Sequence, residues 1–442
     1  MIYPDKPMFK ESIDKEELEK SENWGTLGAH DPSIFNDNGV YYVFSTDARV
    51  GGAAKQSIQV RKSKDLINWE YIGTALSDIP KEAKEWTGAE GIWAPELIKI
   101  NNEYYLYYCA STFGKNRSCI GLLKSDSIYG PWKDCGIVIK TEENDNRNAI
   151  DPNLICDENG ELWMAYGSFW SGIYLVALNK RSGKIKKSDD IGIRIAGRHY
   201  STEGAIEGPY IIYNKDQGKY YLFVSYDSLG SDYNIRVGRS QNIYGPYKDI
   251  NGVEMTDTTV INPNHVGNKI AGGYRFGNKE GWIAPGHNSV LNINEEYFVV
   301  HHIRREYNPS WFYMNVRRIL WSDDGWPMML PEKYAGEFEQ KIDEEELSGL
   351  WEFITLYRDV NRVMVSKIYK FGEGNQISGE NNGRWFFEDI NKIKIRILME
   401  EEVDEYKGKI IPAWDWEENI PTLVFTAINK NGVALWGKRI YK

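Results

Sequence analysis

Residues 150–169, IDPNLICDENGELWMAYGSF, contain a unit that recurs along the chain. A short motif with a proline precedes an apolar strand, the DENG turn places glycine where a positive φ is needed, and a second, aromatic strand follows. Related head motifs, spaced 56 to 80 residues apart, contain Asp31, Ala94, Asp151, Glu207 and His287. Each spacing accommodates four antiparallel strands with loops of variable length. The repeat therefore predicts an all-β fold with a five-bladed β-propeller, in preference to a sandwich of short strands.

A different pattern begins after about residue 334. An acidic connecting stretch, 335–350, leads into six short strand-like segments. We expect a small β-barrel or β-sandwich there, and the lack of functional motifs favours a structural or lid-like module. The expected organisation is an N-terminal extension over 1–24, the propeller over 25–334 and a C-terminal β domain over 335–442.

The composition excludes some classes of partner. Tyr and Trp number 29 and 16 in 442 residues, which suits both β-sheet packing and contact with carbohydrate. The net charge is -11, and Lys and Arg form no cluster with interleaved aromatic residues, so nucleic acid is not expected as a partner. No apolar run reaches the length of a membrane span, so no membrane partner is expected either. The oligomeric state is left open.

Two features of the sequence bear on the compartment. The four cysteines, Cys109, Cys119, Cys135 and Cys156, show no metal-ligand spacing. Cys109 and Cys119 could face each other across a hairpin, although buried free thiols are favoured. The N-terminus lacks a basic segment followed by an apolar core. Two locations stay open: the cytoplasm, with imported oligosaccharides as substrate, and the cell exterior, with a signal peptide removed.

Carboxylates stand at the heads of three repeats. The innermost strands of a propeller line its central channel, so their first residues converge, and this places Asp31, Asp151 and Glu207 together. Three carboxylates in one pocket repel each other, so at least one should hold a proton near neutral pH. A protonated acid paired with an ionised base is what glycoside hydrolysis requires. For Asp31 or Asp151 taken singly, the plainer alternative is that an aspartate before proline is only a turn residue.

The motifs HDPSIF, WAPEL, AIDPNLI, GSFWSG, AIEGPYI and APGHNSV resemble, in order, the blade motifs of glycoside hydrolase family 43, and most closely its endo-1,5-α-L-arabinanases. The resemblance covers about residues 25–330, and the C-terminal domain is similar to that of two-domain bacterial arabinanases. It implies an inverting hydrolase in which Asp31 is the general base and Glu207 the general acid. Asp151 would lie beside Glu207, keep it protonated and orient it. Inversion implies that the carboxyls of Asp31 and Glu207 lie about 6.5–9.5 Å apart.

The resemblance also implies a calcium ion on the propeller axis, held by His287 with waters completing the shell. A lone histidine at a strand start is more often a hydrogen-bonded core residue, and calcium prefers oxygen ligands. His30 precedes the base and could help fix it. His301 and His302 alternate along a strand, so at most one faces a given pocket.

Sugar contacts are expected from aromatic side chains near the blade heads. Trp93 and Phe113 match the family's sugar-stacking residues, and Phe169 and Trp170 are further aromatic candidates, although blade packing is the fate of most aromatic residues here. Ser168 is a candidate to bond a sugar hydroxyl, and Glu203 is expected to be a solvated loop residue.

Three functions compete on these grounds. The preferred one is an endo-arabinanase acting on arabinan or arabino-oligosaccharides. The second is an exo-acting α-L-arabinofuranosidase or β-xylosidase of the same family. The third is a non-catalytic sugar-binding propeller, which would have no need for all three carboxylates.

Overall fold

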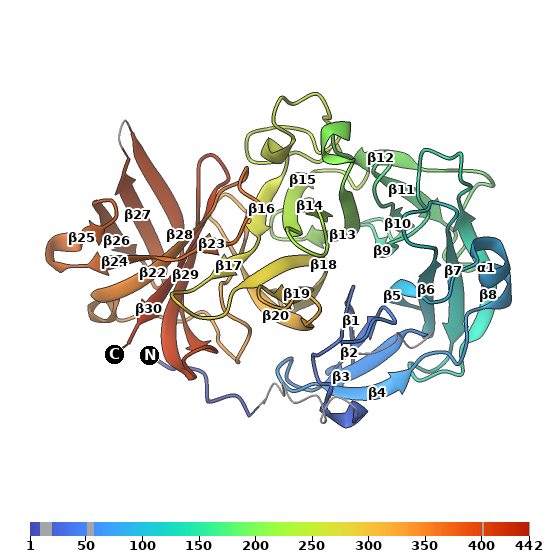
Figure 1. Ribbon diagram of the computed structural model, residues 1–442, viewed down its shortest axis with the longest axis horizontal. Helices are drawn as coiled ribbons and strands as arrows, with labels where there is room; N and C mark the ends of the chain where they lie inside the picture. Colours follow the sequence, from blue (N-terminus) through green and yellow to red (C-terminus); the bar gives the residue numbers. More distant parts are fainter. Residues whose placement is uncertain (9–19, 51–56, 400–401, 442) are drawn as a thin grey trace.

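The computed structural model describes residues 1–8, 20–50, 57–399 and 402–441. It consists of a five-bladed propeller and a closed barrel lying beside it (Figure 1). The predicted all-β propeller is therefore confirmed. Part of the expected N-terminal extension, residues 9–19, lies outside the described residues.

Each blade is an antiparallel sheet whose first strand lines the centre. Blade 1 consists of β1 (Ser33–Asp37), β2 (Val40–Ser45), β3 (Gln59–Ser63) and β4 (Glu70–Thr74). Blade 2 consists of β5 (Trp93–Ile100), β6 (Glu103–Ala110), β7 (Cys119–Ser125) and β8 (Lys133–Lys140). Blade 3 consists of β9 (Asn153–Cys156), β10 (Leu162–Tyr166), β11 (Ile173–Leu178) and β12 (Ile193–Ala196).

Blade 4 consists of β13 (Ile206–Asn214), β14 (Lys219–Tyr226), β15 (Asn234–Ser240) and β16 (Asn268–Ala271). Blade 5 consists of β18 (Trp282–Ile293), β19 (Glu296–Arg305), β20 (Phe312–Trp321) and β21 (Pro327–Met329), extended by β17 (Tyr274–Arg275) and β23 (Met364–Val365). The 3-10 turns are η2 (Ser21–Asn23), η3 (Tyr200–Thr202), η4 (Pro263–His265), η5 (Glu344–Leu347) and η6 (Glu373–Asn375). Helix α1 (Lys81–Thr87) joins blades 1 and 2, and no helix among the described residues is long and apolar enough to cross a membrane.

One backbone feature repeats at the head of every blade. The residue before the head proline adopts a left-handed conformation, with φ between 33° and 58°, at Asp31, Ala94, Asp151, Gly208 and Ala284. The repeat is therefore real, but its register differs from the expected one in two blades. Glu207 lies one residue before this position in blade 4, and His287 lies three residues after it in blade 5.

The N-terminal segment closes the ring of blades, because it pairs with the first residues of β20 in blade 5. Leu27 forms a bridge with Tyr313, and the N–H of Gly28 donates to Phe312 O at 3.0 Å. The first and last blades are thus hydrogen-bonded to each other, which fixes the channel and the residues that line it.

Polar side chains tie the inner strands together below the blade heads. Glu96 accepts hydrogen bonds from Ser33 Oγ at 2.6 Å and from Asn153 Nδ2 at 3.1 Å, which links blades 1, 2 and 3. The N–H of Ile211 in blade 4 donates to Asn153 Oδ1 at 2.8 Å. Because burial raises the pKa of Glu96 to about 7, this network contains a carboxyl group close to its neutral form.

The C-terminal barrel has eight strands, where the sequence predicted six. They are β22 (Gly349–Leu356), β24 (Lys367–Phe371), β25 (Gln376–Gly379), β26 (Gly383–Glu388), β27 (Lys392–Leu398), β28 (Val403–Asp415), β29 (Ile420–Asn429) and β30 (Ala434–Ile440). The two missed strands are the short β25 and β28, whose first half is charged and lacks a continuous apolar pattern. Aromatic side chains, including Trp351, Phe371 and Phe425, fill the interior.

A buried ion cluster lies where the barrel contacts the propeller. The Nζ of Lys438 lies 3.0 Å from Glu332, 3.2 Å from Asp415 and 2.5 Å from Glu417. Removing one partner from such a cluster leaves buried charge uncompensated, so it fixes the way the two domains fit together.

All four cysteines are free. Cys109 and Cys119 are buried, as expected, whereas Cys135 is half-buried and Cys156 is exposed, so the expectation of buried thiols is wrong for that second pair.

Candidate active site

The head of the propeller channel gathers the three predicted carboxylates around one histidine. The Nδ1 of His287 lies 3.2 Å from Asp31 Oδ1 and 4.0 Å from Asp151 Oδ2. Asp151 in turn accepts a hydrogen bond from the N–H of Gly208, next to Glu207, at 3.1 Å. Four blades therefore contribute one residue each to a common site.

Asp31 is held as an ionised carboxylate. His30 Nδ1 lies 2.9 Å from its Oδ1, and Thr46 Oγ1 donates to its Oδ2 at 2.6 Å. Burial alone would raise the pKa of Asp31, but His30 and His287 hold it well below its usual range. A carboxylate that is ionised throughout the working pH range can accept a proton from water.

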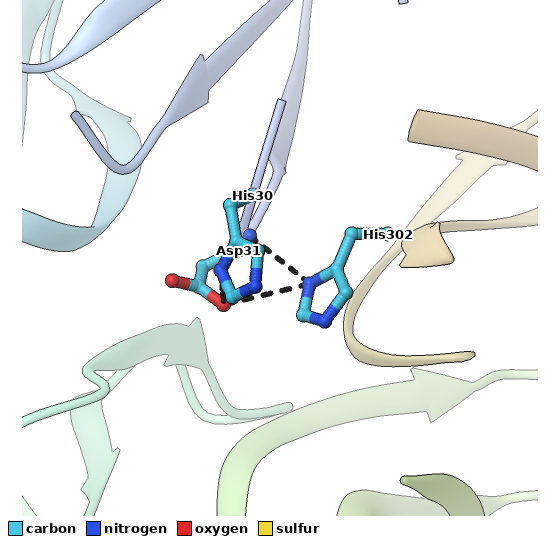
Figure 2. A group of neighbouring side chains, drawn as sticks. All are labelled: His30, Asp31 and His302. Carbon is cyan, nitrogen blue, oxygen red and sulfur yellow. Dashed lines mark hydrogen bonds and ion pairs between the residues drawn. The ribbon is translucent and has the colours of Figure 1, made fainter. Parts of the chain in front are cut away.

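The two histidines beside Asp31 have roles fixed by their partners (Figure 2). Arg304 Nη2 lies 2.9 Å from His30 Nε2, and because a guanidinium only donates, that nitrogen accepts. The proton of a neutral His30 is therefore on Nδ1, where it points to Asp31. His302 Nδ1 accepts from the N–H of Asp31 at 3.3 Å. The side chains of His30, Asp31 and His302 lie close enough together to hold a metal ion. The Nδ1 atoms of His30 and His302, however, already contact Asp31.

Asp151 is the carboxyl with a raised pKa. It is buried, and its N–H donates to Cys109 Sγ at 3.0 Å. Burial and the nearby charges of Glu207 and Asp31 raise its pKa to about 7, against the opposing effect of His287. The sequence predicted that at least one of the three carboxyls would have a raised pKa, and Asp151 is such a group.

Glu207 receives a donor on each carboxyl oxygen. Tyr233 donates its hydroxyl to Oε1 at 2.7 Å, and Ser168 donates to Oε2 at 2.8 Å. Glu207 itself is half-buried at the start of β13, whereas Glu203 is exposed, as expected. Ser168 is buried and its hydroxyl is engaged with Glu207, so its position favours orienting that carboxyl over contacting a sugar.

His287 is the residue best placed to face a cation. Asp31 and Asp151 overcome the effect of burial and raise its pKa to about 9, so the site favours positive charge at this point. A calcium ion takes six to eight oxygen ligands, and one imidazole supplies a single nitrogen. The donor set therefore fits a cation that keeps most of its water and is attracted by the surrounding carboxylates.

Aromatic side chains surround the site on loops at the same end of the propeller. Trp93 and Phe169 are half-buried, Trp170 is 39% exposed and Phe113 is 82% exposed. Two further exposed residues were not predicted: Tyr200 in η3 and Tyr307 between β19 and β20, which are 85% and 72% exposed. An exposed aromatic ring on a polar rim is suited to stacking on a sugar.

The sequence analysis also missed Thr46, Tyr233 and Arg304. Thr46 and Tyr233 come from loops that follow the second strand of a blade, and Arg304 is the last residue but one of β19. None belongs to the repeated head motif, and a single sequence offers no signal that would have selected them.

Comparison with known proteins gives a consistent result. The sequence model of glycosyl hydrolases family 43 matches residues 26–327, and that of a C-terminal lipocalin-like domain matches residues 331–437. The chain is 34% identical to the extracellular endo-α-(1->5)-L-arabinanase of Thermotoga petrophila, over 93% of each protein. It is 30% identical to the extracellular exo-α-(1->5)-L-arabinofuranosidase of Cellvibrio japonicus, over 72% of this chain and 90% of the relative.

The fold is also similar to a solved structure along both domains. The crystal structure of endo-1,5-α-L-arabinanase from Thermotoga petrophila superposes with a TM-score of 0.85 at 32% identity. The superposition covers 94% of this chain and 99% of that one.

Proposed function

The chain belongs to glycosyl hydrolases family 43, and from this premise we propose that it is an inverting hydrolase that cleaves internal α-1,5-L-arabinofuranosidic bonds of arabinan or arabino-oligosaccharides. The observation that carries the proposal is the division of roles among its carboxyl groups. Asp31 is kept ionised by His30 and His287, while Glu207 lies beside a carboxyl whose pKa is raised. A glycoside hydrolase needs an ionised base and a carboxyl group that delivers a proton, and we assign the second role to Glu207.

The chemical step follows from these two roles. Water held by Asp31 attacks the anomeric carbon of the arabinofuranosyl unit and gives its proton to that carboxylate. The bond from this carbon to the bridging oxygen breaks, and Glu207 gives its proton to that oxygen. Tyr233 and Ser168 then stabilise the carboxylate that Glu207 becomes, because hydrogen bonds to an ionised acceptor are stronger than those to a neutral one.

Cleavage within the chain is favoured over release of single sugars. Exposed aromatic side chains lie on loops within blades 2, 3 and 5, at Phe113, Trp170 and Tyr307, and on the connection from blade 3 to blade 4, at Tyr200. Several separate stacking positions suit several sugar units. The relative from Thermotoga petrophila, which aligns with 93% of this chain, is also named as an endo enzyme.

We also propose that His287 holds a hydrated calcium ion through its remaining ring nitrogen. The ion would supply positive charge that stabilises the three carboxylates close together. Calorimetric titration with calcium should show binding to the native protein and none to His287→Ala, and equal binding by both would refute this assignment.

The function is tested by a product time course on debranched arabinan. The native protein should release oligosaccharides of mixed length, and Glu207→Gln should release none. Glu203→Gln provides the matched control, because that glutamate is exposed and lies four residues away. NMR of the first products should show the inverted anomer.

The alternatives give different products. Arabinose alone from the first time point would indicate the exo-acting enzyme. No product from arabinan, arabino-oligosaccharides or xylan would leave a sugar-binding propeller.

A further inference from the structure

One loop of the propeller contacts the supports of both catalytic carboxyls. This 227–233 loop joins β14 to β15. At its end, Tyr233 donates to Glu207. In its middle, the carbonyl of Leu229 accepts from Arg304 Nε at 2.7 Å, and the same guanidinium contacts His30, the partner of Asp31. The position of this loop therefore affects the acid and the base together.

The first residue of the loop also fixes the chain that leads to the acid. The N–H of Asp227 donates to the carbonyl of Ala205 at 3.1 Å, two residues before Glu207. Arg198 forms an ion pair with Asp227 and donates to the same carbonyl at 3.1 Å. Asp227 is thus the junction between the 227–233 loop and the segment that enters β13.

A segment of the C-terminal barrel covers this junction. Residues 357–366, between β22 and β24, leave the barrel and lie against blades 4 and 5. Asn361 Nδ2 donates to Asp227 Oδ2 at 3.0 Å. Val363 and Leu229 pack against the cluster of Tyr233, Ile283 and Ala284. The barrel therefore contacts the first residue of the loop and packs against the cluster that contains its last residue.

The covering segment is itself firmly held. Its strand β23 pairs in parallel with β17, so that a strand of the barrel chain extends the sheet of blade 5 (Figure 1). The buried Nζ of Lys269 donates to the carbonyl of Val360 at 2.6 Å, and the buried Arg236 donates to the carbonyl of Arg358 at 2.6 Å. Asn361 is thus presented by a segment anchored on both sides.

We propose that the C-terminal barrel is part of the catalytic apparatus of this enzyme, and that Asn361 is a positioning residue which holds the 227–233 loop, and through it Glu207 and Asp31, in the reactive arrangement. This inference rests on the proposed glycosidase function and deepens it. It gives the barrel a specific task in place of the structural or lid-like role expected from the sequence.

The test compares two variants that each lose one contact between the domains. Asn361→Ala removes the hydrogen bond to Asp227. Lys392→Ala is the matched control, because its ion pair with Asp323, 2.7 Å long, also joins barrel to propeller but involves no residue of the loop. Val363→Ala serves as a second loop-directed variant should the first fold poorly.

Two readouts are needed. Hydrogen exchange should be faster over residues 227–233 in Asn361→Ala and unchanged in Lys392→Ala. On arabinan, kcat should fall about tenfold in Asn361→Ala with KM unchanged, because a small misplacement of catalytic groups is costly even when its cause is remote. A merely structural contact would lower the melting temperature and leave kcat of the folded protein unchanged.

The outcomes separate this inference from the function on which it rests. Unchanged exchange over residues 227–233 in Asn361→Ala would overturn the inference whatever the substrate. Faster exchange with native kcat would overturn it as well. A native protein that hydrolyses no pentosan would refute the proposed function.

Discussion

The hydroxyl of Tyr233 offers a direct test of the acid role of Glu207. It is buried, it stacks on His302 with ring centroids 5.7 Å apart, and it donates to Glu207 Oε1 at 2.7 Å. Tyr233→Phe removes this donor and leaves the ring. As Glu207 loses its proton in the transition state, the hydrogen bond gains strength, so its loss should raise the barrier more than it weakens substrate binding.

The size of the effect follows from one hydrogen bond to an ionised group. Such a bond contributes about 1.5–3 kcal/mol, which corresponds to a decrease in kcat of about 10- to 150-fold. KM on arabinan should stay close to the native value. Tyr226→Phe is the matched control, because that hydroxyl is also buried in blade 4 but has no hydrogen-bond partner among the described residues, and its kcat should be native.

The assay that identifies the step uses two leaving groups. An aryl arabinofuranoside with a dinitrophenolate leaving group needs little help from an acid, whereas a sugar leaving group depends on it. The defect of Tyr233→Phe should therefore be large on arabino-oligosaccharides and nearly absent on the aryl substrate. Equal losses on both substrates would show that Tyr233 acts elsewhere than on the acid.

Three further predictions concern the supports of the site and the fold. Arg304→Gln should lower kcat about tenfold with little change in KM, because His30 loses the donor that keeps its proton directed at Asp31. Glu96→Gln should reduce the pH dependence of stability: the folded state holds the Glu96 proton up to about pH 7, so this group costs the native protein on the order of 3 kcal/mol of stability as pH rises from about 4.5 to 7, and thermal melts of the variant should show a shallower slope. Lys438→Met should lower the free energy of unfolding by about 3–5 kcal/mol in denaturant titrations, because the buried Glu332 and Asp415 and the half-buried Glu417 lose their counter-charge.

The repeated features of this protein could be predicted from one sequence. Hairpin turns and proline-containing heads recur in every blade, so the number of blades and the convergence of Asp31, Asp151 and Glu207 followed from the pattern. The strands that were missed, β25 and β28, lie in the barrel, where no repeat supports a weak local signal. The hydrophobic pattern of a strand shows which of its residues share a face. The blade repeat shows which of those residues come together at the centre of the propeller.

The groups that tune the carboxyls could not be predicted in the same way. Tyr233 and Arg304 reach the site from non-equivalent positions, and Asn361 reaches it from the other domain. Each acts through a contact made only when distant segments fold together. The location of the raised pKa at Asp151 likewise depends on burial, which a linear pattern does not reveal.

The offset of Glu207 explains why the acid departs from the repeat. In blades 1 and 3 the left-handed head residue is itself an aspartate, whereas in blade 4 it is Gly208. A Cβ at Gly208 would lie 3.0 Å from the ring of His287, so a side chain there would crowd the histidine that contacts Asp31. A carboxyl at the preceding position avoids this contact, and the longer side chain of a glutamate extends its reach. The one-residue offset of Glu207, the proposed acid, is thus consistent with packing around His287.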